Sequence, residues 1–233
     1  MNINLKNNLV KFYKELEAEC LRCGRNPDEI KILFASKYLN SEQLASFIAL
    51  YNQLRGQKVI IGENRVQEAE EKFQYLQKER PDLGGKYYRI MIGNLQKNKI
   101  NRALVIFDEI WGVDSPLLAQ EIDNRATSKP VPIFLEVNIS GEAGKHGVTP
   151  DRLDGVIRSV GKCRKLKLKG LMTMAPETED REKIRKIFRE LRQAADKYHL
   201  LTSMGMSGDW REAVEAGSKI LRIGSGIFVN PET

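Results

Sequence analysis

Hydrophobic and polar positions along the chain form two patterns that alternate from one end to the other. Short apolar runs bounded by polar residues are typical of buried strands. Longer segments between them carry apolar residues at helical spacing, such as Leu9, Phe12 and Leu16 in the first segment. The expected strands cover about 32–37, 59–61, 87–92, 105–113, 131–138, 166–171, 202–204 and 220–223, and the expected helices about 5–22, 41–55, 65–79, 95–103, 116–129, 150–160, 179–199 and 209–216.

This order of elements predicts the fold class. Eight strands that alternate with helices, with no linker rich in Ser, Gly or Pro, indicate an α/β protein with a closed (β/α)8 TIM barrel. We expect one domain over residues 1–233, with a leading N-terminal helix, because barrels of this length are commonly single domains. An open doubly wound parallel sheet is the alternative. In either fold, ligands bind where the strands end.

Composition narrows the class of protein. Hydrophobic residues make up 41% and charged residues 30% of the chain, and no run approaches the roughly 18 apolar residues of a membrane span. The first residues lack the apolar core of a secretory signal, so we expect a cytoplasmic protein with no membrane partner. Cys20 and Cys23 form a Cys-x-x-Cys pair, but no second pair completes a zinc site and Cys163 stands alone, so we expect no metal.

The net charge of +7 and the pI near 9.2 indicate an anionic partner. Lysines and arginines are spread along the chain, and the densest run, residues 162–169, alternates with leucines like the exposed side of a strand. A surface that attracts small phosphorylated ligands accounts for this pattern better than a nucleic-acid surface.

Lys37 stands at the end of the first expected strand, where strand meets loop. Position alone allows two interpretations, a lysine that extends into water from a strand end or a lysine in a ligand site.

Two glycine clusters follow the last two expected strands. Ser203-Met204-Gly205-Met206-Ser207-Gly208 comes just before a helix, and Ser207 is both a possible N-cap and a possible phosphate ligand. Gly224-Ser225-Gly226 follows the eighth strand, and its glycines let backbone N–H groups approach a phosphate closely. The loops after strands seven and eight are a common phosphate site in barrels.

Arg222 lies inside an apolar strand, on the face opposite Leu221 and Ile223. A guanidinium keeps its charge, so it needs a partner when it is buried. The alternatives are an ion pair with a glutamate or aspartate of a neighbouring strand, or a donor aimed at a ligand in the barrel mouth.

A phosphate cradle on the last two strands, opposite a lysine on the first, suits pyridoxal 5′-phosphate. Its aldehyde condenses with an amine while its phosphate is anchored some distance away. Segments along nearly the whole chain resemble the pyridoxal phosphate homeostasis protein family. They are 34–37 (Phe-Ala-Ser-Lys), 62–68, 92–99, 137–142, 145–147 (Lys-His-Gly), 170–174, 203–207 and 222–225.

The resemblance implies a fold-type III barrel like the N-terminal domain of alanine racemase, with pyridoxal 5′-phosphate (PLP) as cofactor. It assigns one role to each matching residue: the Schiff-base lysine is Lys37, the phosphate ligands are Ser207, Gly224 and Ser225, the residue near the pyridine nitrogen is Arg222, the residue beside the ring is Asn64, and an auxiliary lysine is Lys145.

The chain departs from the family pattern at four positions. Arg89 and Ile90 stand where Trp-His is usual, Arg65 stands where Tyr is common, and Asn94 also differs. We expect these changes to alter one wall of the site and its ligand selectivity.

The implied function is PLP homeostasis: holding the cofactor reversibly and buffering it or delivering it to PLP-dependent apoenzymes, without robust catalysis. An arginine beside the pyridine nitrogen disfavours its protonation and weakens the cofactor as an electron sink. The chain ends soon after the eighth strand, so we expect no racemase-type second domain. A PLP-dependent amino-acid racemase and a phosphate-sugar barrel enzyme without PLP are the alternatives. We expect a monomer or a weak homodimer.

Overall fold

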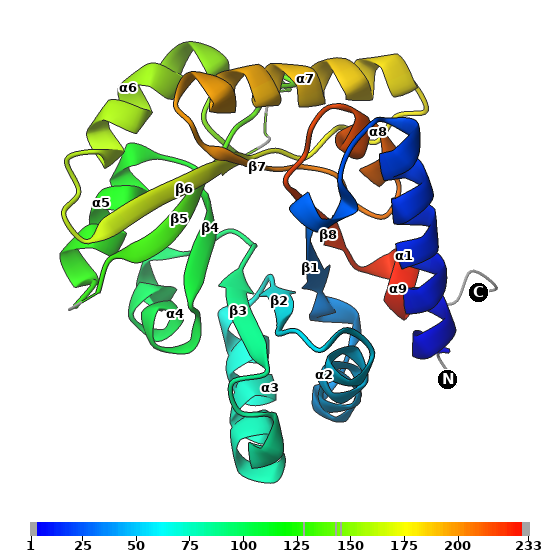
Figure 1. Ribbon diagram of the computed structural model, residues 1–233. Helices are drawn as coiled ribbons and strands as arrows, with labels where there is room; N and C mark the ends of the chain where they lie inside the picture. Colours follow the sequence, from blue (N-terminus) through cyan, green and yellow to red (C-terminus); the bar gives the residue numbers. More distant parts are fainter. Residues whose placement is uncertain (1–3, 128, 143, 145, 230–233) are drawn as a thin grey trace.

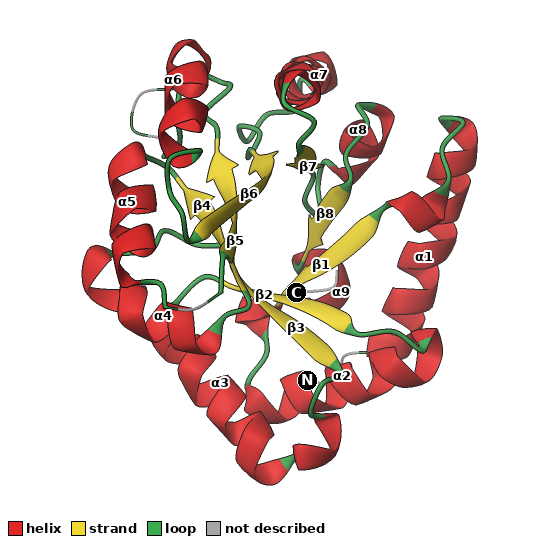
Figure 2. Ribbon diagram, turned by 60° about the vertical axis from the view of Figure 1, so that its left-hand side comes forward, coloured by secondary structure: helices red, strands yellow, loops and turns green. Residues whose placement is uncertain are grey.

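The computed structural model describes residues 4–127, 129–142, 144 and 146–229. Eight parallel strands close into a barrel in chain order, because β1 pairs with β2 on one side and with β8 on the other. Helices surround the strands in both views (Figures 1 and 2). The predicted (β/α)8 barrel is confirmed, and the open doubly wound sheet is wrong.

The strands of the barrel are short. Their bounds are β1 (Lys31–Ala35), β2 (Val59–Glu63), β3 (Tyr87–Met91), β4 (Glu109–Val113), β5 (Val131–Glu136), β6 (Leu166–Met172), β7 (Leu201–Ser203) and β8 (Ile220–Ile223).

The helices alternate with these strands, and the first precedes the barrel. Their bounds are α1 (Leu5–Arg22), α2 (Ser41–Arg55), α3 (Val66–Glu79), α4 (Ile100–Ile106), α5 (Pro116–Arg125), α6 (Pro150–Val160), α7 (Arg181–Lys197), α8 (Trp210–Glu215) and α9 (Ser225–Phe228).

Local sequence sets where several helices begin and end. The side chain of Asn40 accepts a hydrogen bond from Gln43 N, and Gln43 returns one to Asn40 N, which is a capping box at the start of α2. Gly56 ends this helix in the left-handed conformation (φ +64°). Ser115 accepts a hydrogen bond from Leu118 N and caps α5.

The segment after β3 differs from the expected helix 95–103 and strand 105–113. A single 3₁₀ turn precedes α4, and α4 continues to Ile106. Ile100 and Ala103, three positions apart, lie on the buried face of α4, while Val105 lies on its outer face and is 78% exposed. The apolar residues near Val105 therefore belong to the helix and not to a strand. The fourth strand therefore begins only at Glu109.

Two hydrophobic clusters build the core. The larger one fills the space between strands and helices. A smaller one of alternate strand residues fills the barrel interior, where the rings of Trp111 and Phe134 lie 4.1 Å apart between centroids. The filled interior leaves the two ends of the barrel as the places where polar side chains gather.

The leading helix α1 lies beside α8 and α9 (Figure 1). The rings of Phe12 and Trp210 meet edge to face at 5.5 Å, and Asn8 Nδ2 donates to the carbonyl oxygen of Ile227 at 2.9 Å. The first contact packs α1 against α8, and the second joins it to α9, which follows β8. Within the described ranges, no helix has the length and apolar character needed to cross a bilayer.

Candidate functional site

Lys37 lies just beyond β1, in the 3₁₀ turn Ser36–Tyr38. Its side chain is exposed, and Nζ lies 5.0 Å from the ring centroid of Tyr38, within cation–π range. The turn stands at the carboxyl end of the strand, which is where ligands bind in this fold. The amine is therefore accessible at the mouth of the barrel.

Ser207 joins the two glycine clusters. Its hydroxyl oxygen accepts hydrogen bonds from Gly224 N at 3.3 Å and from Gly226 N at 3.0 Å. The N-cap of α8 is Asp209, so the interpretation of Ser207 as a cap of that helix is wrong. Ser225 lies between the two donors and is exposed. Two N–H groups thus converge on a single oxygen at the loop after β8, an arrangement that also suits an oxygen of an anion.

Lys37 and this cradle are neighbours. β1 and β8 pair in parallel, and a Cβ atom at Gly224 would lie 3.0 Å from Cε2 of Tyr38 and 3.2 Å from the carbonyl oxygen of Ala35. Glycine at this position lets the loop after β8 approach the turn of Lys37 closely. Closure brings the first and last strands together, so the turn of Lys37 and the cradle are adjacent at the mouth of the barrel.

Arg222 is 5% exposed and extends from β8 inside the barrel. Nη1 donates to the carbonyl and hydroxyl oxygens of Ser203, and Nη2 to the carbonyl oxygen of Thr173, each at 2.8 Å. Burial lowers the pKa of the guanidinium, and the nearby Asp209 and Glu136 carboxylates oppose this. No carboxylate of the described residues pairs directly with it, so the alternative of an ion pair is wrong. Its role as a ligand donor stays a prediction.

Asn64 follows β2 at the same end of the barrel and is half-buried. A Cβ atom at Gly93 would lie 2.3 Å from the Asn64 carbonyl oxygen, so glycine permits the loops after β2 and β3 to touch. The role of Asn64 beside a cofactor ring stays a prediction. Lys145, the expected auxiliary lysine, lies outside the described residues.

The departures at Arg89 and Ile90 lie away from the mouth. Arg89 pairs with Asp108 at 2.8 Å, and Asp108 directly precedes β4, at the end where strands begin. Ile90 packs inside the barrel in the cluster that includes Leu33 and Trp111. The expectation that these two changes alter a wall of the site is therefore wrong.

The other two departures lie where strands end. Arg65 is exposed and pairs with Glu68 at 2.8 Å in the first turn of α3. Asn94 Nδ2 lies 3.1 Å from His146 Nδ1, and this nitrogen lies 3.6 Å from an Asp114 carboxylate oxygen. These three side chains link the loops after β3, β4 and β5, so Asn94 contributes to the rim of the mouth.

A cavity of about 730 Å³ opens at the ends of β5 and β6. Its lining includes Glu136, His146, Met174 and Met206. Glu136 is buried, and burial raises the pKa of its carboxyl, although the positive charge of Arg222 opposes the rise. The sequence analysis missed Glu136; an acidic residue at the end of an apolar strand was the available signal.

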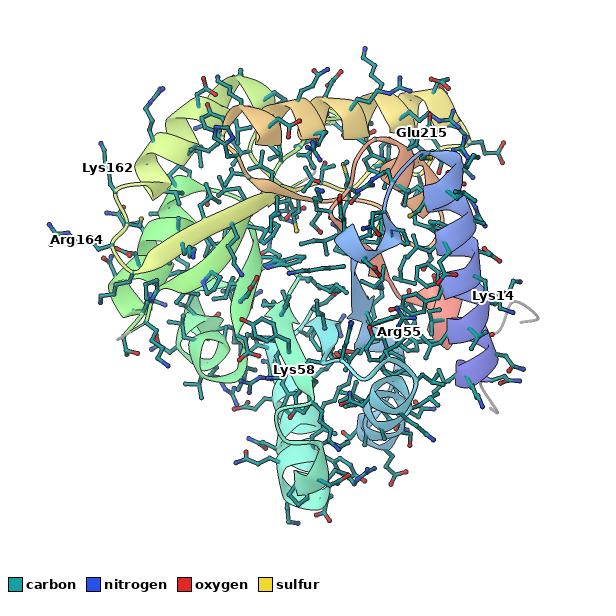
Figure 3. All side chains as sticks on the ribbon, in the orientation of Figure 1. Lys14, Arg55, Lys58, Lys162, Arg164 and Glu215 are labelled. Carbon is teal, nitrogen blue, oxygen red and sulfur yellow. The ribbon has the colours of Figure 1, made fainter. Side chains whose placement is uncertain are left out.

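A second cavity, of about 640 Å³, opens at the other end of the barrel. Arg55 and Lys58, labelled in Figure 3, border it, and Trp111 Nε1 donates to the buried Glu109 at 2.8 Å in its floor. None of the predicted site residues that the structure describes lines it. The predicted site thus belongs to one end of the barrel.

The structure also reveals a buried pair that the sequence analysis missed. Lys72 Nζ lies 2.8 Å from Glu63 Oε1, and Ser36 bonds to both side chains. Lys72 follows Val66 and Ala69 at helical spacing, so a lysine on the buried face of α3 was the signal.

The described residues contain no group of His, Cys, Asp and Glu side chains arranged to hold a metal ion. Cys20, Cys23 and Cys163 are free thiols.

Comparisons with known proteins agree with this geometry. The family described as "Alanine racemase, N-terminal domain" matches residues 53–231. An alanine racemase of Clostridium difficile 630 superposes with a TM-score of 0.74 at 16% identity, over 99% of this chain and 57% of the racemase, which shows a shared fold. The fold and the lysine at the mouth therefore define a barrel of the alanine racemase N-terminal domain class.

Relatives of similar length identify the family more narrowly. The "Pyridoxal phosphate homeostasis protein" of Aquifex aeolicus is 35% identical over 97% of this chain and 98% of its own length, and that of Escherichia coli K12 is 32% identical over 97% and 96%. PipY of Synechococcus elongatus, solved with PLP bound, has a TM-score of 0.76 at 29% identity, over 92% of this chain and 98% of PipY. The chain belongs to the pyridoxal phosphate homeostasis protein family.

Proposed function

We propose that this protein binds PLP reversibly as a Schiff base on Lys37 and serves in intracellular PLP homeostasis, buffering the cofactor or delivering it. One observation carries the proposal: the turn that carries the exposed Lys37 lies against the loop of Gly224, where the Ser207 hydroxyl and two backbone N–H groups form a cradle. When bound, the cofactor supplies an aldehyde, and condensation with the amine forms a C=N bond and releases water. The names of the relatives and the PLP bound in PipY support the same function.

The cradle fits a phosphate group. The N–H groups of Gly224 and Gly226 already converge on one oxygen at hydrogen-bonding distance, and the hydroxyl groups of Ser207 and Ser225 add two donors. Gly224 keeps this loop next to the turn of Lys37, so one small molecule can reach the amine and the cradle together.

Arg222 and Asn64 complete the proposed site. Arg222 would lie near the pyridine nitrogen of the bound cofactor, where its positive charge would disfavour protonation of that nitrogen. Three hydrogen bonds hold the guanidinium in place, and it stays charged because a guanidinium keeps its proton in proteins even where burial lowers its pKa. Asn64 lies beside the ring, and Lys145 acts as an auxiliary lysine. With an unprotonated nitrogen the cofactor withdraws electrons weakly, which favours storage over carbanion chemistry.

The racemase alternative has less support. The relatives at about 30% identity carry the homeostasis name, whereas the racemase likeness lies at 16% identity and concerns the fold alone. A racemase would exchange the α-hydrogen of an amino acid. We expect no rapid exchange or racemisation when the PLP-loaded protein is incubated with single L-amino acids in deuterated water.

The proposal also covers the domain organisation, the oligomeric state, the location and the partners of the protein. Residues 1–233 act as one domain, a monomer or weak homodimer in the cytoplasm, whose partners are PLP and PLP-dependent apoenzymes.

The test compares three purified proteins after incubation with PLP: the wild type, Lys37→Ala and Lys31→Ala. Lys31 is exposed at the opposite end of β1 and serves as the matched control. We expect an imine absorbance band in the wild type and in the control, and its absence in Lys37→Ala. Borohydride reduction followed by peptide mapping should modify Lys37. A colourless wild type would favour a barrel enzyme without PLP, and label on another lysine would contradict the assignment.

A further inference from the structure

An ion pair is buried directly beneath the turn that carries Lys37. Glu63 is the last residue of β2 and is 0% exposed, and Lys72 lies on α3 and is 7% exposed. Lys72 Nζ and Glu63 Oε1 are 2.8 Å apart. Removing two charges from water costs free energy, and their mutual attraction often fails to repay this cost. The pair therefore calls for an explanation other than stability.

The pair bonds to the hydroxyl and to the backbone carbonyl of Ser36. The Ser36 hydroxyl donates to Glu63 Oε1 at 2.6 Å, and Lys72 Nζ donates to the Ser36 carbonyl oxygen at 3.0 Å. The same carbonyl accepts from Leu39 N at 3.0 Å, the bond that closes the 3₁₀ turn. Because Lys37 follows Ser36 directly, these bonds fix the backbone from which its side chain extends.

Stability alone does not account for this arrangement. Replacing a buried ion pair with apolar residues of similar volume is often neutral or stabilising. Glu63 Oε2 has no hydrogen-bond partner in the part of the chain that the structure describes, so half of this carboxylate is buried without a direct hydrogen bond. What the charged groups provide, and apolar side chains cannot, is a donor and an acceptor for Ser36.

We propose that Glu63 and Lys72 are positioning residues that hold the turn Ser36–Tyr38 against the loop of Gly224, so that the Lys37 amine and the cradle can engage one ligand together. This inference rests on the proposed Schiff base at Lys37. Preorganisation of two contacts on one ligand strengthens binding because the second contact forms within the complex. If the turn moves, the amine and the phosphate cradle no longer engage one molecule together.

The probes are PLP and pyridoxal, which carries the aldehyde without the phosphate. The ratio of the pyridoxal dissociation constant to the PLP dissociation constant measures how well the amine and the cradle cooperate. Loss of amine reactivity or of folded protein weakens both ligands equally and leaves the ratio unchanged, whereas a displaced Lys37 lowers it.

The main variant is the double substitution Glu63→Met with Lys72→Met, which removes both charges together and avoids an unpaired buried charge. We expect an unfolding temperature equal to or above that of the wild type and a fall of about tenfold in the ratio. The matched control is Lys78→Met with Glu79→Met, an exposed pair on the same helix with a 3.0 Å separation, which should change neither quantity.

Ser36→Ala provides a second variant that removes only the hydroxyl, so it keeps the test decisive if the double variant fails to fold. Its ratio should fall in the same direction by a smaller factor. A folded double variant with the wild-type ratio overturns the positioning role, as does an unchanged ratio in Ser36→Ala if the double variant does not fold. If instead the wild type shows no imine at Lys37, the proposed function itself has failed.

Discussion

Ser207→Ala tests the phosphate cradle and the local structure in one variant. In the protein without ligand, the hydroxyl oxygen accepts hydrogen bonds from Gly224 N and Gly226 N, at the first turn of α9. It therefore acts like an N-cap supplied by a distant residue, and loss of such a cap costs about 1 kcal/mol of unfolding free energy. In a chain of this length we expect the unfolding temperature to fall by about 2–4 °C.

The same substitution should reduce the free energy of PLP binding by more than it reduces the free energy of unfolding. The serine hydroxyl is proposed to donate to the phosphate, and a hydrogen bond to a charged group contributes roughly 1.5–3 kcal/mol. Its loss raises the PLP dissociation constant roughly 10- to 150-fold. Pyridoxal, which has no phosphate, should bind the variant and the wild type alike.

The assays are thermal unfolding with and without PLP, and titration of the imine absorbance. At equal PLP concentration the difference in unfolding temperature between wild type and variant should grow, because the weaker ligand stabilises less. Ser46→Ala is the control, since Ser46 is an exposed serine whose hydroxyl donates to the Glu42 carbonyl within α2. An unchanged PLP dissociation constant for Ser207→Ala would falsify the assignment of the phosphate to this cradle.

Two further substitutions test other parts of the structure. Burial raises the pKa of the Glu136 carboxyl. Between the ordinary glutamate pKa and the raised one, the folded wild type therefore holds a proton that the unfolded chain has lost. Its unfolding free energy falls as pH rises through this range. Glu136→Gln should remove this loss, giving a higher urea midpoint than the wild type at neutral pH but no gain below the ordinary pKa; a gain at all pH values would contradict the reasoning. Gly170→Ala would place a Cβ atom 2.1 Å from Phe134 and 2.6 Å from the backbone oxygen of Leu201, so we expect a loss of about 1–3 kcal/mol in urea unfolding. Gly155→Ala, in open space on α6, should stabilise instead, and equal effects of the two would show that packing is not the cause.

Local patterns along the chain predicted most of the elements. Helix α6 and strand β8 have the predicted bounds, and Asn40 and Ser115 cap the helices that follow them. These signals are reliable because periodicity and capping depend on residues a few positions apart. The prediction failed near Val105, where an apolar run was interpreted as a strand although its spacing also suits a helix.

The candidate site was predicted in its residue types but not in its contacts. The positions of Lys37 and of the serine and glycine clusters at strand ends followed from the order of elements and from the family resemblance. The partners of Arg222 did not, because a buried guanidinium can be satisfied equally by carboxylates or by the carbonyl oxygens that it meets here. Which buried polar atom bonds to which depends on the approach of distant strands.

The sequence by itself determined the alternation of strands and helices, the lysine after the first strand and the glycines after the last. Only the tertiary structure decided between a closed barrel and an open sheet, and the pairing of β1 with β8 in the closed barrel makes these two loops neighbours. The pairing of β7 with β8 makes Ser207 an acceptor for the loop after β8 and not a cap of α8, and the packing of α3 brings Lys72 to the Ser36 carbonyl. Such contacts join residues far apart along the chain, so no local pattern of hydrophobic and polar residues contains them.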